Sequence, residues 1–365
     1  MKSLDQVAST GIAINATNTP GDAAYEAVIS APGSYYLTGN LGVNKTNGIH
    51  VTVGGVTVDL NGFQIARASG SGGGGVLINI GADNVVVQNG SIDGFASGSD
   101  GIASTGGAFL RLSVSHCTSI GLRGGNGWKF EGCRAHDNTL SQIAIQAASG
   151  STLSNCTAQN NTCSTAISTD AGCTLTNCSA ISNSGPVGNG FQVGDGSTLT
   201  NCSATSNTGI GFDLISAIAF GAVATNCAAI QNGLFGFSCR SATITGCIAN
   251  GNFDGIVCEA GCVVSNNTSD YNAEHGFKFY SSNVVTGNNA SKNGSNGFIS
   301  TGSLNRIDGN SATGNGGVGF LWVNDFVVRN TSFANTGGNY KPAVGVFNTG
   351  PVQAASSATN AWANF

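Results

Sequence analysis

Polar, small and aliphatic residues recur along the chain in units of 20 to 25 residues. Each unit is anchored by a cysteine or an asparagine, at Cys133, Cys156, Cys178, Cys202, Cys227, Cys247, Asn267, Asn288, Asn310 and Asn330. The side chain three residues before most anchors is aliphatic, and the side chain two residues after most of them is small. A glycine followed by an aromatic or aliphatic residue comes later in each unit, as in Gly276-Phe277. Because alternation within a short strand places one set of side chains inward, the pattern predicts three short strands per unit.

An asparagine follows every anchor at the same distance of five residues. These residues are Asn138, Asn161, Asn183, Asn207, Asn232, Asn252, Asn272, Asn293, Asn315 and Asn335. A side-chain amide both donates and accepts hydrogen bonds, so stacked asparagines would satisfy backbone groups at a turn. Asparagine also tolerates the left-handed conformation that a sharp corner requires. We therefore expect an asparagine ladder along one corner of stacked coils.

One such unit cannot bury its own apolar face, whereas coils stacked about 4.8 Å apart bury a continuous core. The prediction is an all-β chain forming a single-stranded right-handed parallel β-helix, with three strands per coil and roughly 11–13 coils. An aromatic stack is expected inside, formed by Phe191, Phe212, Phe237, Phe277, Phe298 and Phe320. A leucine-rich repeat is excluded because leucine is too rare, and a calcium-binding roll is excluded because its Gly-Gly-x-Gly-x-Asp unit is absent.

The extent of the repeat sets the predicted domain boundaries. We expect a leader and N-terminal cap over residues 1–33, the β-helix over 34–335, and a C-terminal cap or tail over 336–365. Caps are expected because the strands at the end of a β-helix leave their backbone N–H and C=O groups unpaired. Trp362 and Phe365 are predicted to plug the core, and residues 70–75 to form a loop. The short step from Cys117 to Cys133 predicts an irregular coil.

Composition narrows the possible partners. Charged residues make up 8% of the chain, the net charge is −5 and no basic run occurs, which disfavours nucleic acid. No apolar stretch of about 18 residues is present to span a membrane. The 12 cysteines include no Cys-x-x-Cys pair, so a common zinc site is disfavoured, and we interpret them as buried thiols of the core. Disulfide or metal roles are the alternatives, and Cys239 and Cys258 are the pair to test for them.

Two segments carry a resemblance to a known family. The run Pro32-Gly33-Ser34-Tyr35-Tyr36-Leu37-Thr38-Gly39-Asn40-Leu41, followed by Val58-Asp59-Leu60-Asn61-Gly62-Phe63, resembles the opening of bacterial right-handed parallel β-helix repeat proteins of the pectin-lyase-like superfamily. The Asn-Cys-x-Ala-x-x-Asn coils and the closing Trp362-Ala363-Asn364-Phe365 are similar to the same group. The resemblance implies the fold over nearly the whole chain. Characterised members include lyases, polygalacturonases, epimerases, phage tailspikes and adhesins, so it implies no single activity.

The resemblance also implies an extracellular or cell-surface protein whose partner is a polysaccharide or a cell-surface glycan. The segment from Met1 to Asp5 lacks the apolar run of a signal peptide, so either the protein is cytosolic or an export signal has been removed. The resemblance favours the second alternative. The Asn-Thr-Asp, Asp-Asp and Gly-His-Gly motifs of polygalacturonases are absent, and the arginine-centred motif of pectate lyases has no clean match. The oligomeric state is not indicated.

Charged residues are scarce enough that two clusters emerge as candidate sites. The first contains Arg111, His116, Arg123, Trp128, Lys129, Glu131, Arg134, His136 and Asp137. A polysaccharide lyase needs a base to remove the proton beside a uronate carboxylate, and cations to hold the resulting charge. We therefore predict catalytic roles for Lys129, Arg134 and His136. Substrate-binding roles are predicted for Arg111, Arg123 and Trp128, the last by stacking on a sugar. The alternative is surface charge around an irregular coil.

The second cluster spans two coils, with Asp254 and Glu259 on one and Glu274, His275, Lys278 and Tyr280 on the next. Alignment of the glycines before Ile256 and Phe277 predicts that Asp254 lies beside His275 and Glu259 beside Tyr280. Asp254, His275 and Lys278 are the candidate catalytic residues, and Glu259 and Tyr280 are the candidate substrate-binding residues. The paired carboxylates of this cluster suit the acid and the nucleophile or base of a glycosidase. Asp254, Glu259 and Glu274 would also suit Ca²⁺, the one cofactor indicated. The alternative is a solvated face with weak ion pairs.

The predicted function is a secreted β-helix protein that binds or cleaves an acidic polysaccharide by lyase or hydrolase chemistry. The alternative is a non-catalytic surface protein, an adhesin or a structural β-helix, which the regular and charge-poor outer face favours. An ice- or mineral-binding face would need an unbroken threonine array, and the column of Thr152, Thr174, Thr198 and Thr243 is interrupted at Val223.

Overall fold

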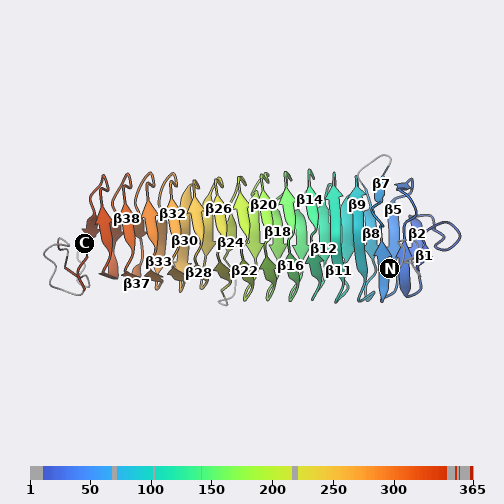
Figure 1. The fold of residues 1–365 in the computed structure, drawn as a ribbon, viewed down its shortest axis with the longest axis horizontal. Helices are drawn as coiled ribbons and strands as arrows, with labels where there is room; N and C mark the ends of the chain where they lie inside the picture. Colours follow the sequence, from blue (N-terminus) through green and yellow to red (C-terminus); the bar gives the residue numbers. More distant parts are fainter. Residues whose placement is uncertain are drawn as a thin grey trace, which may run out of the picture. The chain divides into compact units, whose positions relative to one another are not determined.

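The computed structural model describes residues 11–67, 72–101, 103–140, 142–215, 221–342, 350, 351, 353 and 362–364. Across these residues the chain consists of strands and turns and contains no helix, hence none that is long and apolar enough to cross a membrane. The named strands pair in parallel with the strands of neighbouring coils (Figure 1). The predicted all-β parallel β-helix is therefore confirmed, with the right-handed crossovers that parallel connections adopt.

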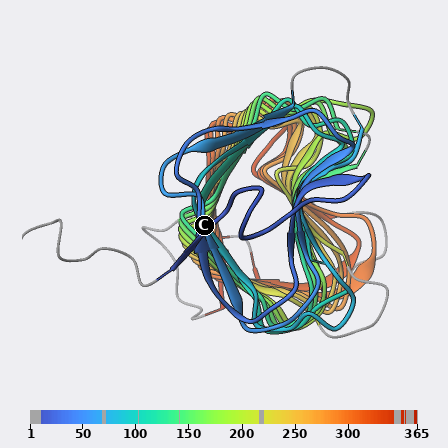
Figure 2. The ribbon, with the colours of Figure 1, turned by 90° about the vertical axis from the view of Figure 1, so that its right-hand side faces the viewer.

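Each regular coil is built from three strands. Two short strands meet at a corner and a longer strand follows after a turn, as in the coil of residues 129–131, 134–136 and 143–147. The short strands of successive coils pair in sheet A, and the longer strands pair in sheet B. Figure 2 looks along the coils and shows the strands arranged around their interior.

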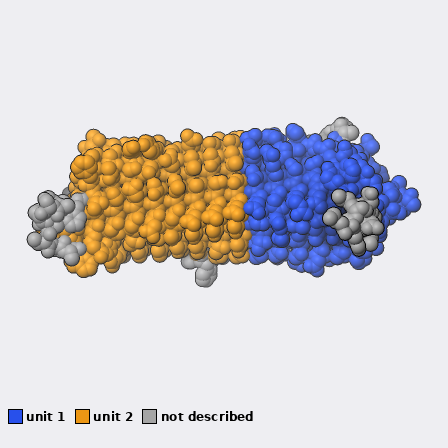
Figure 3. Space-filling view, in the orientation of Figure 1, with its two compact units in different colours: residues 1–164 blue, residues 165–365 orange. Residues whose placement is uncertain are grey.

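The chain divides into two compact units, residues 1–164 and residues 165–365 (Figure 3). Within the described residues, sheet B has six strands in unit 1, in the order β2-β5-β8-β10-β12-β15. In unit 2 it has nine, in the order β18-β21-β24-β27-β30-β33-β36-β39-β42. The coils outnumber the roughly 11–13 predicted from the repeat. One reason is that β2 already pairs with β5, so residues assigned to the leader contribute a strand, with Ala27 and Ile29 buried.

The strands of unit 1 are β1 (Ile12–Ala13), β2 (Tyr25–Ile29), β3 (Gly33–Tyr36), β4 (Leu41–Val43), β5 (Asn47–Val51), β6 (Val56–Asp59), β7 (Gln64–Arg67), β8 (Gly74–Ile78), β9 (Val86–Asp93), β10 (Ser97–Gly101), β11 (Ala108–Ser115), β12 (Ile120–Gly124), β13 (Lys129–Glu131), β14 (Arg134–His136), β15 (Ile143–Ala147), β16 (Thr152–Ser154) and β17 (Thr157–Gln159).

The strands of unit 2 are β18 (Thr165–Thr169), β19 (Thr174–Thr176), β20 (Ser179–Ile181), β21 (Asn189–Val193), β22 (Thr198–Thr200), β23 (Ser203–Thr205), β24 (Phe212–Leu214), β25 (Val223–Thr225), β26 (Ala228–Ile230), β27 (Phe235–Cys239), β28 (Thr243–Thr245), β29 (Ile248–Asn250), β30 (Asp254–Ala260), β31 (Val263–Ser265), β32 (Thr268–Asp270), β33 (Phe277–Ser281), β34 (Val284–Thr286), β35 (Asn289–Ser291), β36 (Phe298–Ser300), β37 (Ser303–Asp308), β38 (Ser311–Thr313), β39 (Phe320–Trp322), β40 (Asn324–Val328), β41 (Thr331–Phe333) and β42 (Tyr340–Pro342).

The predicted asparagine ladder is confirmed, and it runs along the corner that follows the second short strand. Asn293 shows the pattern: its Oδ1 accepts the backbone N–H of Asn272 at 3.0 Å and the side-chain Nδ2 of Asn272 at 2.9 Å. Its own Nδ2 donates to the carbonyl of Ser269 at 2.9 Å and to Oδ1 of Asn315 at 2.9 Å. Each buried amide therefore satisfies backbone groups of the preceding coil as well as the next rung.

The left-handed conformation expected of the ladder asparagines instead falls one residue earlier. Tyr271 and Lys292, which directly precede ladder positions, have φ of 54° and 53°. The chain turns at these residues, and the buried asparagine that follows directs its amide into the ladder. Asparagine does supply left-handed corners elsewhere, directly before many anchors, as at Asn226 and Asn266 with φ of 53° and 57°.

The irregular coil predicted between Cys117 and Cys133 is not found. The backbone N–H of Cys117 donates to Oδ1 of Asn138 at 2.8 Å, so Cys117 occupies the ladder corner rather than an anchor position. Ser113 pairs with Arg134 in register, and the coil between them has an ordinary length. The error arose because a cysteine fits both corners of the coil as a small buried side chain.

The predicted aromatic stack is confirmed in unit 2. Phe191, Phe212 and Phe237 stack with ring centroids 4.7 and 4.8 Å apart, and Phe277, Phe298 and Phe320 stack at 4.7 Å. Ile256 separates the two stacks, since it pairs with both Phe237 and Phe277. Every cysteine is buried, as expected for core thiols.

Two smaller predictions, for residues 70–75 and for the C-terminal segment, need correction. Gly74 and Gly75 begin strand β8 rather than a loop, and Gly70 lies outside the described residues. Trp362 does not plug the core, because 52% of it is exposed, and Phe365 lies outside the described residues. Asn364 instead continues the column of anchor asparagines, where its Oδ1 accepts the backbone N–H of Asn330 at 3.0 Å.

Candidate functional site

The first predicted cluster is distributed over different strands of unit 1. Arg123 lies on β12 in sheet B and forms an ion pair with Asp100, whereas Lys129 lies on β13 in sheet A and pairs with Glu131 at 2.6 Å. Arg111 sits at a left-handed corner within β11 and donates from Nε to Asn89 at 2.8 Å. These cations therefore lie on more than one face of the coils.

Arg134 and His136 share β14 and have their own neighbours. Arg134 donates to Oε1 of Gln159 at 3.0 Å. Nδ1 of His136 lies 2.8 Å from Asp137, whose pKa is lowered by that hydrogen bond, and Nε2 lies 3.0 Å from the hydroxyl of Ser113. Each residue proposed for lyase chemistry thus has its own polar partner, with Lys129 on β13 and both Arg134 and His136 on β14.

Trp128 was predicted to stack on a sugar, and this prediction is wrong. Its side chain is fully buried and packs against Phe109 with ring centroids 4.6 Å apart. The indole Nε1 donates to the carbonyl of Ser104 at 3.2 Å, so the polar edge of the ring is also satisfied inside the coil. A buried indole of this kind belongs to the core and is not available to a ligand.

The second predicted cluster lies on the outer face of sheet B in unit 2. Strands β30 and β33 pair in register, with Val257 opposite Lys278 and Cys258 opposite Phe279. Phe277 and Phe279 are buried, whereas Lys278 is partly exposed and Tyr280 is 45% exposed. The alternation predicted for this segment is therefore confirmed, and Lys278 and Tyr280 point outward.

Asp254 lies beside His275 as predicted, but the contact is with the backbone. Its Oδ1 accepts the N–H of His275 at 2.9 Å. Asn189 and Asn296 use Oδ1 in the same way at equivalent corners, for Ile210 at 2.9 Å and Val318 at 2.8 Å. One oxygen of Asp254 therefore has a structural role, and the other lies 3.8 Å from Nζ of Lys278.

His275 is set up to donate a hydrogen bond rather than to take a proton at Nδ1. Burial lowers its pKa, and the charge of Asp254 opposes this effect only in part, so the imidazole is neutral at neutral pH. Nδ1 accepts the backbone N–H of Asn296 at 3.3 Å. This bond assigns the proton of the neutral ring to Nε2.

A hollow of about 470 Å³ opens at the end of the same strands, lined by Arg240, Glu259, Ala260, Tyr280 and Ser281. Nε of Arg240 donates to Oε2 of Glu259 at 2.6 Å, and both side chains remain partly exposed. The predicted proximity of Glu259 and Tyr280 is consistent with their shared lining of this hollow. Arg240 was missed by the sequence analysis, although alignment of Cys239 with Cys258 places it beside Glu259.

Asp213 is a second residue that the sequence analysis missed. It lies on β24 and aligns through Ser238 with Val257, so it faces the same side of sheet B. Burial raises the pKa of Asp213, the nearby charge of Glu259 raises it further, and a hydrogen bond from the backbone of Ile215 opposes both effects. Its position directly after the inward Phe212 was the available signal for an outward carboxyl group.

Unit 2 has another hollow, of about 420 Å³, on the outer side of sheet A. Its lining residues are Leu304, Asn305, Arg306, Asn324, Asp325 and Phe326. The guanidinium of Arg306 lies over the ring of Phe326 at 5.5 Å and forms an ion pair with Asp308. Two of its six lining residues, Leu304 and Phe326, are apolar, against one of five, Ala260, in the sheet B hollow, so the sheet B hollow is the better candidate for recognition of a charged ligand.

Solved structures of similar fold include proteins of different activities. The A-module of a mannuronan C-5 epimerase from Azotobacter vinelandii is 14% identical, with 91% of this chain and 89% of that chain covered and a TM-score of 0.39. The catalytic unit of an α-1,3-glucanase from Streptomyces thermodiastaticus is 12% identical, covering 94% and 69%, with a TM-score of 0.42. A surface adhesin of Streptococcus pneumoniae is 11% identical, covering 85% and 82%, with a TM-score of 0.35.

These similarities concern the fold, and the activity has to be argued from the residues of this chain. No curated protein matches the sequence. The family model described as "Right handed beta helix region" matches residues 36–219 and 187–312, which together span most of the chain. The chain therefore belongs to the right-handed β-helix family.

Proposed function

We propose that this protein binds an acidic polysaccharide on the outer face of sheet B in unit 2. The observation that carries the proposal is the open hollow of about 470 Å³ beside Arg240, Glu259 and Tyr280. The exposed ring of Tyr280 offers an amphipathic surface to the face of a sugar. The guanidinium of Arg240 offers the planar pair of donors that carboxylates prefer.

The ion pair between Arg240 and Glu259 is compatible with this role. Both side chains are partly exposed, at 44% and 34%, and an ion pair of this kind is worth only about 0–1 kcal/mol. A carboxylate of the polymer can therefore take the place of Glu259 at little cost. Lys278, 28% exposed, supplies a second cation on the same face, next to the buried Asp254.

The proposal places the protein outside the cell or at its surface, where such polymers occur. It is tested by binding of the full chain to immobilised alginate, pectin, a glycosaminoglycan and a neutral glucan at low and high salt. We expect binding to the acidic polymers, weakened by salt because partly exposed charges are screened. Stronger binding to the neutral glucan, or no binding to any polymer, would contradict the proposal.

Two variants locate the site. Tyr280→Ala and Arg240→Ala should each weaken binding by about tenfold or more, since aromatic and arginine side chains dominate such contacts. Tyr271→Ala is the matched control, because Tyr271 is 56% exposed in the same unit and contacts Lys292 away from the hollow. Equal losses in the control and in Tyr280→Ala would show that the hollow is not the binding site.

Cleavage of the bound polymer is the second candidate, favoured by the carboxyl groups on this face. Asp213 holds a proton more readily than a free aspartic acid because it is buried, while Glu259 lies beside Arg240. Two carboxyl groups in contrasting surroundings are what acid–base cleavage requires. His275 can donate from Nε2, and Lys278 can hold developing negative charge.

The cleavage candidate is tested by incubating each polymer with the protein, with and without Ca²⁺. New reducing ends report hydrolysis, and ultraviolet absorbance of new carbon–carbon double bonds reports elimination. Asp213→Asn should abolish the first product, and His275→Ala should reduce the second. Binding without either product would exclude cleavage of these polymers and leave the binding proposal standing.

A further inference from the structure

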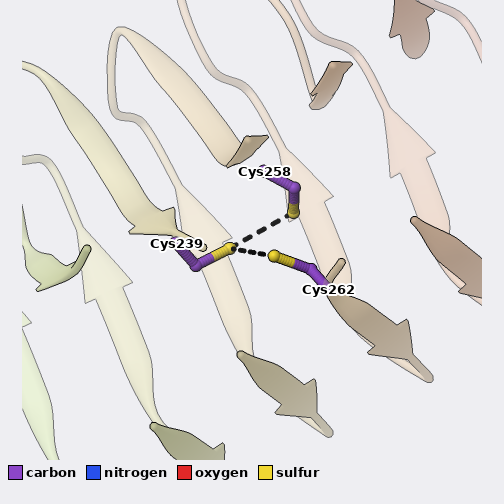
Figure 4. A group of neighbouring side chains, drawn as sticks. All are labelled: Cys239, Cys258 and Cys262. Carbon is purple, nitrogen blue, oxygen red and sulfur yellow. Dashed lines mark hydrogen bonds between the residues drawn. The ribbon is translucent and has the colours of Figure 1, made fainter. Parts of the chain in front are cut away.

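Three cysteine side chains converge inside unit 2 (Figure 4). Cys239 and Cys258 come from neighbouring strands β27 and β30, and Cys262 comes from the corner directly after β30. Sγ of Cys239 lies 3.2 Å from Sγ of Cys258 and 3.7 Å from Sγ of Cys262. All three residues are buried, and their sulfur atoms lie within 4.8 Å of one another.

The arrangement differs from that of the other stacked cysteines. Anchor cysteines such as Cys202 and Cys227 follow one another from coil to coil, so their sulfurs form a row along the stack. Cys262 instead reaches the other two sulfurs from a corner, which turns a pair into a triangle. Among the described residues, this is the group of three whose sulfur, nitrogen or carboxylate atoms come close enough to share one ion.

A disulfide does not suit the closest pair. Cys239 and Cys258 are partners in register on parallel strands, so their Cβ atoms are separated by about the strand spacing of 4.8 Å. Disulfides require a Cβ separation of about 3.5–4.5 Å. An ion between the sulfurs needs no such approach: bonds of about 2.3 Å to three sulfurs in one plane place those sulfurs about 4.0 Å apart.

We propose that Cys239, Cys258 and Cys262 form a buried three-coordinate binding site for a soft monovalent metal ion, Cu(I). Sulfur ligands select soft ions. Zinc prefers four ligands in a tetrahedron, and no fourth histidine, cysteine or carboxylate joins this group among the described residues. The complete burial of the three thiols also keeps water from serving as the fourth ligand.

Charge balance also favours a monovalent ion. One Cu⁺ bound by a single thiolate is neutral in the dry interior, whereas a divalent ion would leave a net positive charge there unless a second thiol is deprotonated. Any further thiol that becomes a thiolate ligand releases its proton to solvent, and the oxidation state of copper does not change.

The cluster also lies next to a route from the surface. Sγ of Cys262 donates to the carbonyl of Ala260 at 3.7 Å. Ala260 lines the hollow beside Arg240 and Glu259. An ion that enters this hollow is therefore separated from the three sulfurs by a single turn of the chain.

The test is an anaerobic titration of the reduced full-length protein with Cu(I) held by a coloured Cu(I) chelator. Loss of the chelate colour measures transfer to the protein, and we expect one tightly bound Cu(I) per chain. Cys262→Ala should weaken this binding by at least about 100-fold, since even partners outside the ligand shell are worth about 10–100-fold. Cys202→Ala, a matched change in the anchor row, should leave the affinity within about threefold.

Cys262→Ala is expected to fold, because Ala242 occupies the equivalent corner of the preceding coil and is equally buried. Its thermal unfolding is measured alongside. X-ray absorption of the loaded protein should show three sulfur ligands at about 2.3 Å. The proposal is overturned if Cys262→Ala binds Cu(I) as tightly as the parent, if Zn²⁺ binds as tightly as Cu(I), or if Cys239 and Cys258 are joined by a disulfide.

Discussion

Replacing Asn293 by alanine removes one rung of the asparagine ladder in unit 2. The substitution deletes the two bonds that Asn293 accepts from Asn272, at 3.0 and 2.9 Å, and the two that it donates, to Ser269 and Asn315, both at 2.9 Å. Asn293 is 2% exposed, so water does not reach the groups that lose their partners. Removal of this one buried side-chain amide should therefore cause a large loss of stability.

The magnitude follows from the groups that are left behind. The backbone N–H of Asn272 becomes a buried donor without its partner, which costs about 1–3 kcal/mol. Loss of the bond to the carbonyl of Ser269 adds about 0.5–1.5 kcal/mol. We therefore expect Asn293→Ala to lower the apparent free energy of unfolding by roughly 2–4 kcal/mol.

Denaturant unfolding of the full chain measures this loss, and amide hydrogen exchange at Asn272 measures it locally. Asn289→Ser is the matched control, because Asn289 lies on the same coil, is half-buried and aligns with Thr268 and Ser311. The control should change stability by about 0.5 kcal/mol or less. A loss of that size for Asn293→Ala, with unchanged exchange at Asn272, would refute the ladder as a source of stability.

Three further outcomes follow from the core and the corners of unit 2. Phe298→Ala breaks the aromatic stack and should cost about 3–5 kcal/mol in denaturant unfolding; a cost under about 1 kcal/mol would contradict the packing. Asp325→Asn should raise the free energy of unfolding by about 1–2 kcal/mol, seen as a higher melting temperature, because Oδ2 of Asp325 is buried without a partner and an amide would match Asn305; a lower melting temperature would contradict this. Because the pKa of His275 is lowered in the folded state, the stability it contributes is present above the unfolded value of about 6.5 and is lost as the pH falls through the folded value. His275→Gln should therefore flatten the dependence of melting temperature on pH below about 6.5, and an unchanged slope would count against this reasoning.

The fold was predictable because the same pattern of anchor, asparagine and inward residues recurs in many successive coils. The asparagine after each anchor and the alternation around Phe277 and Phe298 gave the ladder, the stack and the outward side of sheet B. The register was predictable for the same reason, since like residues align in neighbouring coils. Ambiguity remained where one residue type fits two corners, as Cys117 does.

The candidate site was only partly predictable from the sequence. Alignment of coils placed Asp254 beside His275, but it did not reveal that the backbone N–H makes the contact. Trp128 was assigned to the surface because charged residues follow it in the sequence, whereas in the folded chain its side chain is buried in the core. Arg240 was overlooked because it stands alone in the sequence, and its partner Glu259 lies on the next coil.

Hydrogen exchange of the full chain, with and without an alginate oligosaccharide, tests most directly that the outer face of sheet B in unit 2 binds an acidic glycan. Peptides that contain Arg240, Glu259 and Tyr280 should exchange more slowly in the presence of the ligand, because these residues line the hollow. The protection should disappear in Tyr280→Ala and persist in Tyr271→Ala. Protection confined to other strands, or identical in both variants, would contradict the proposed site.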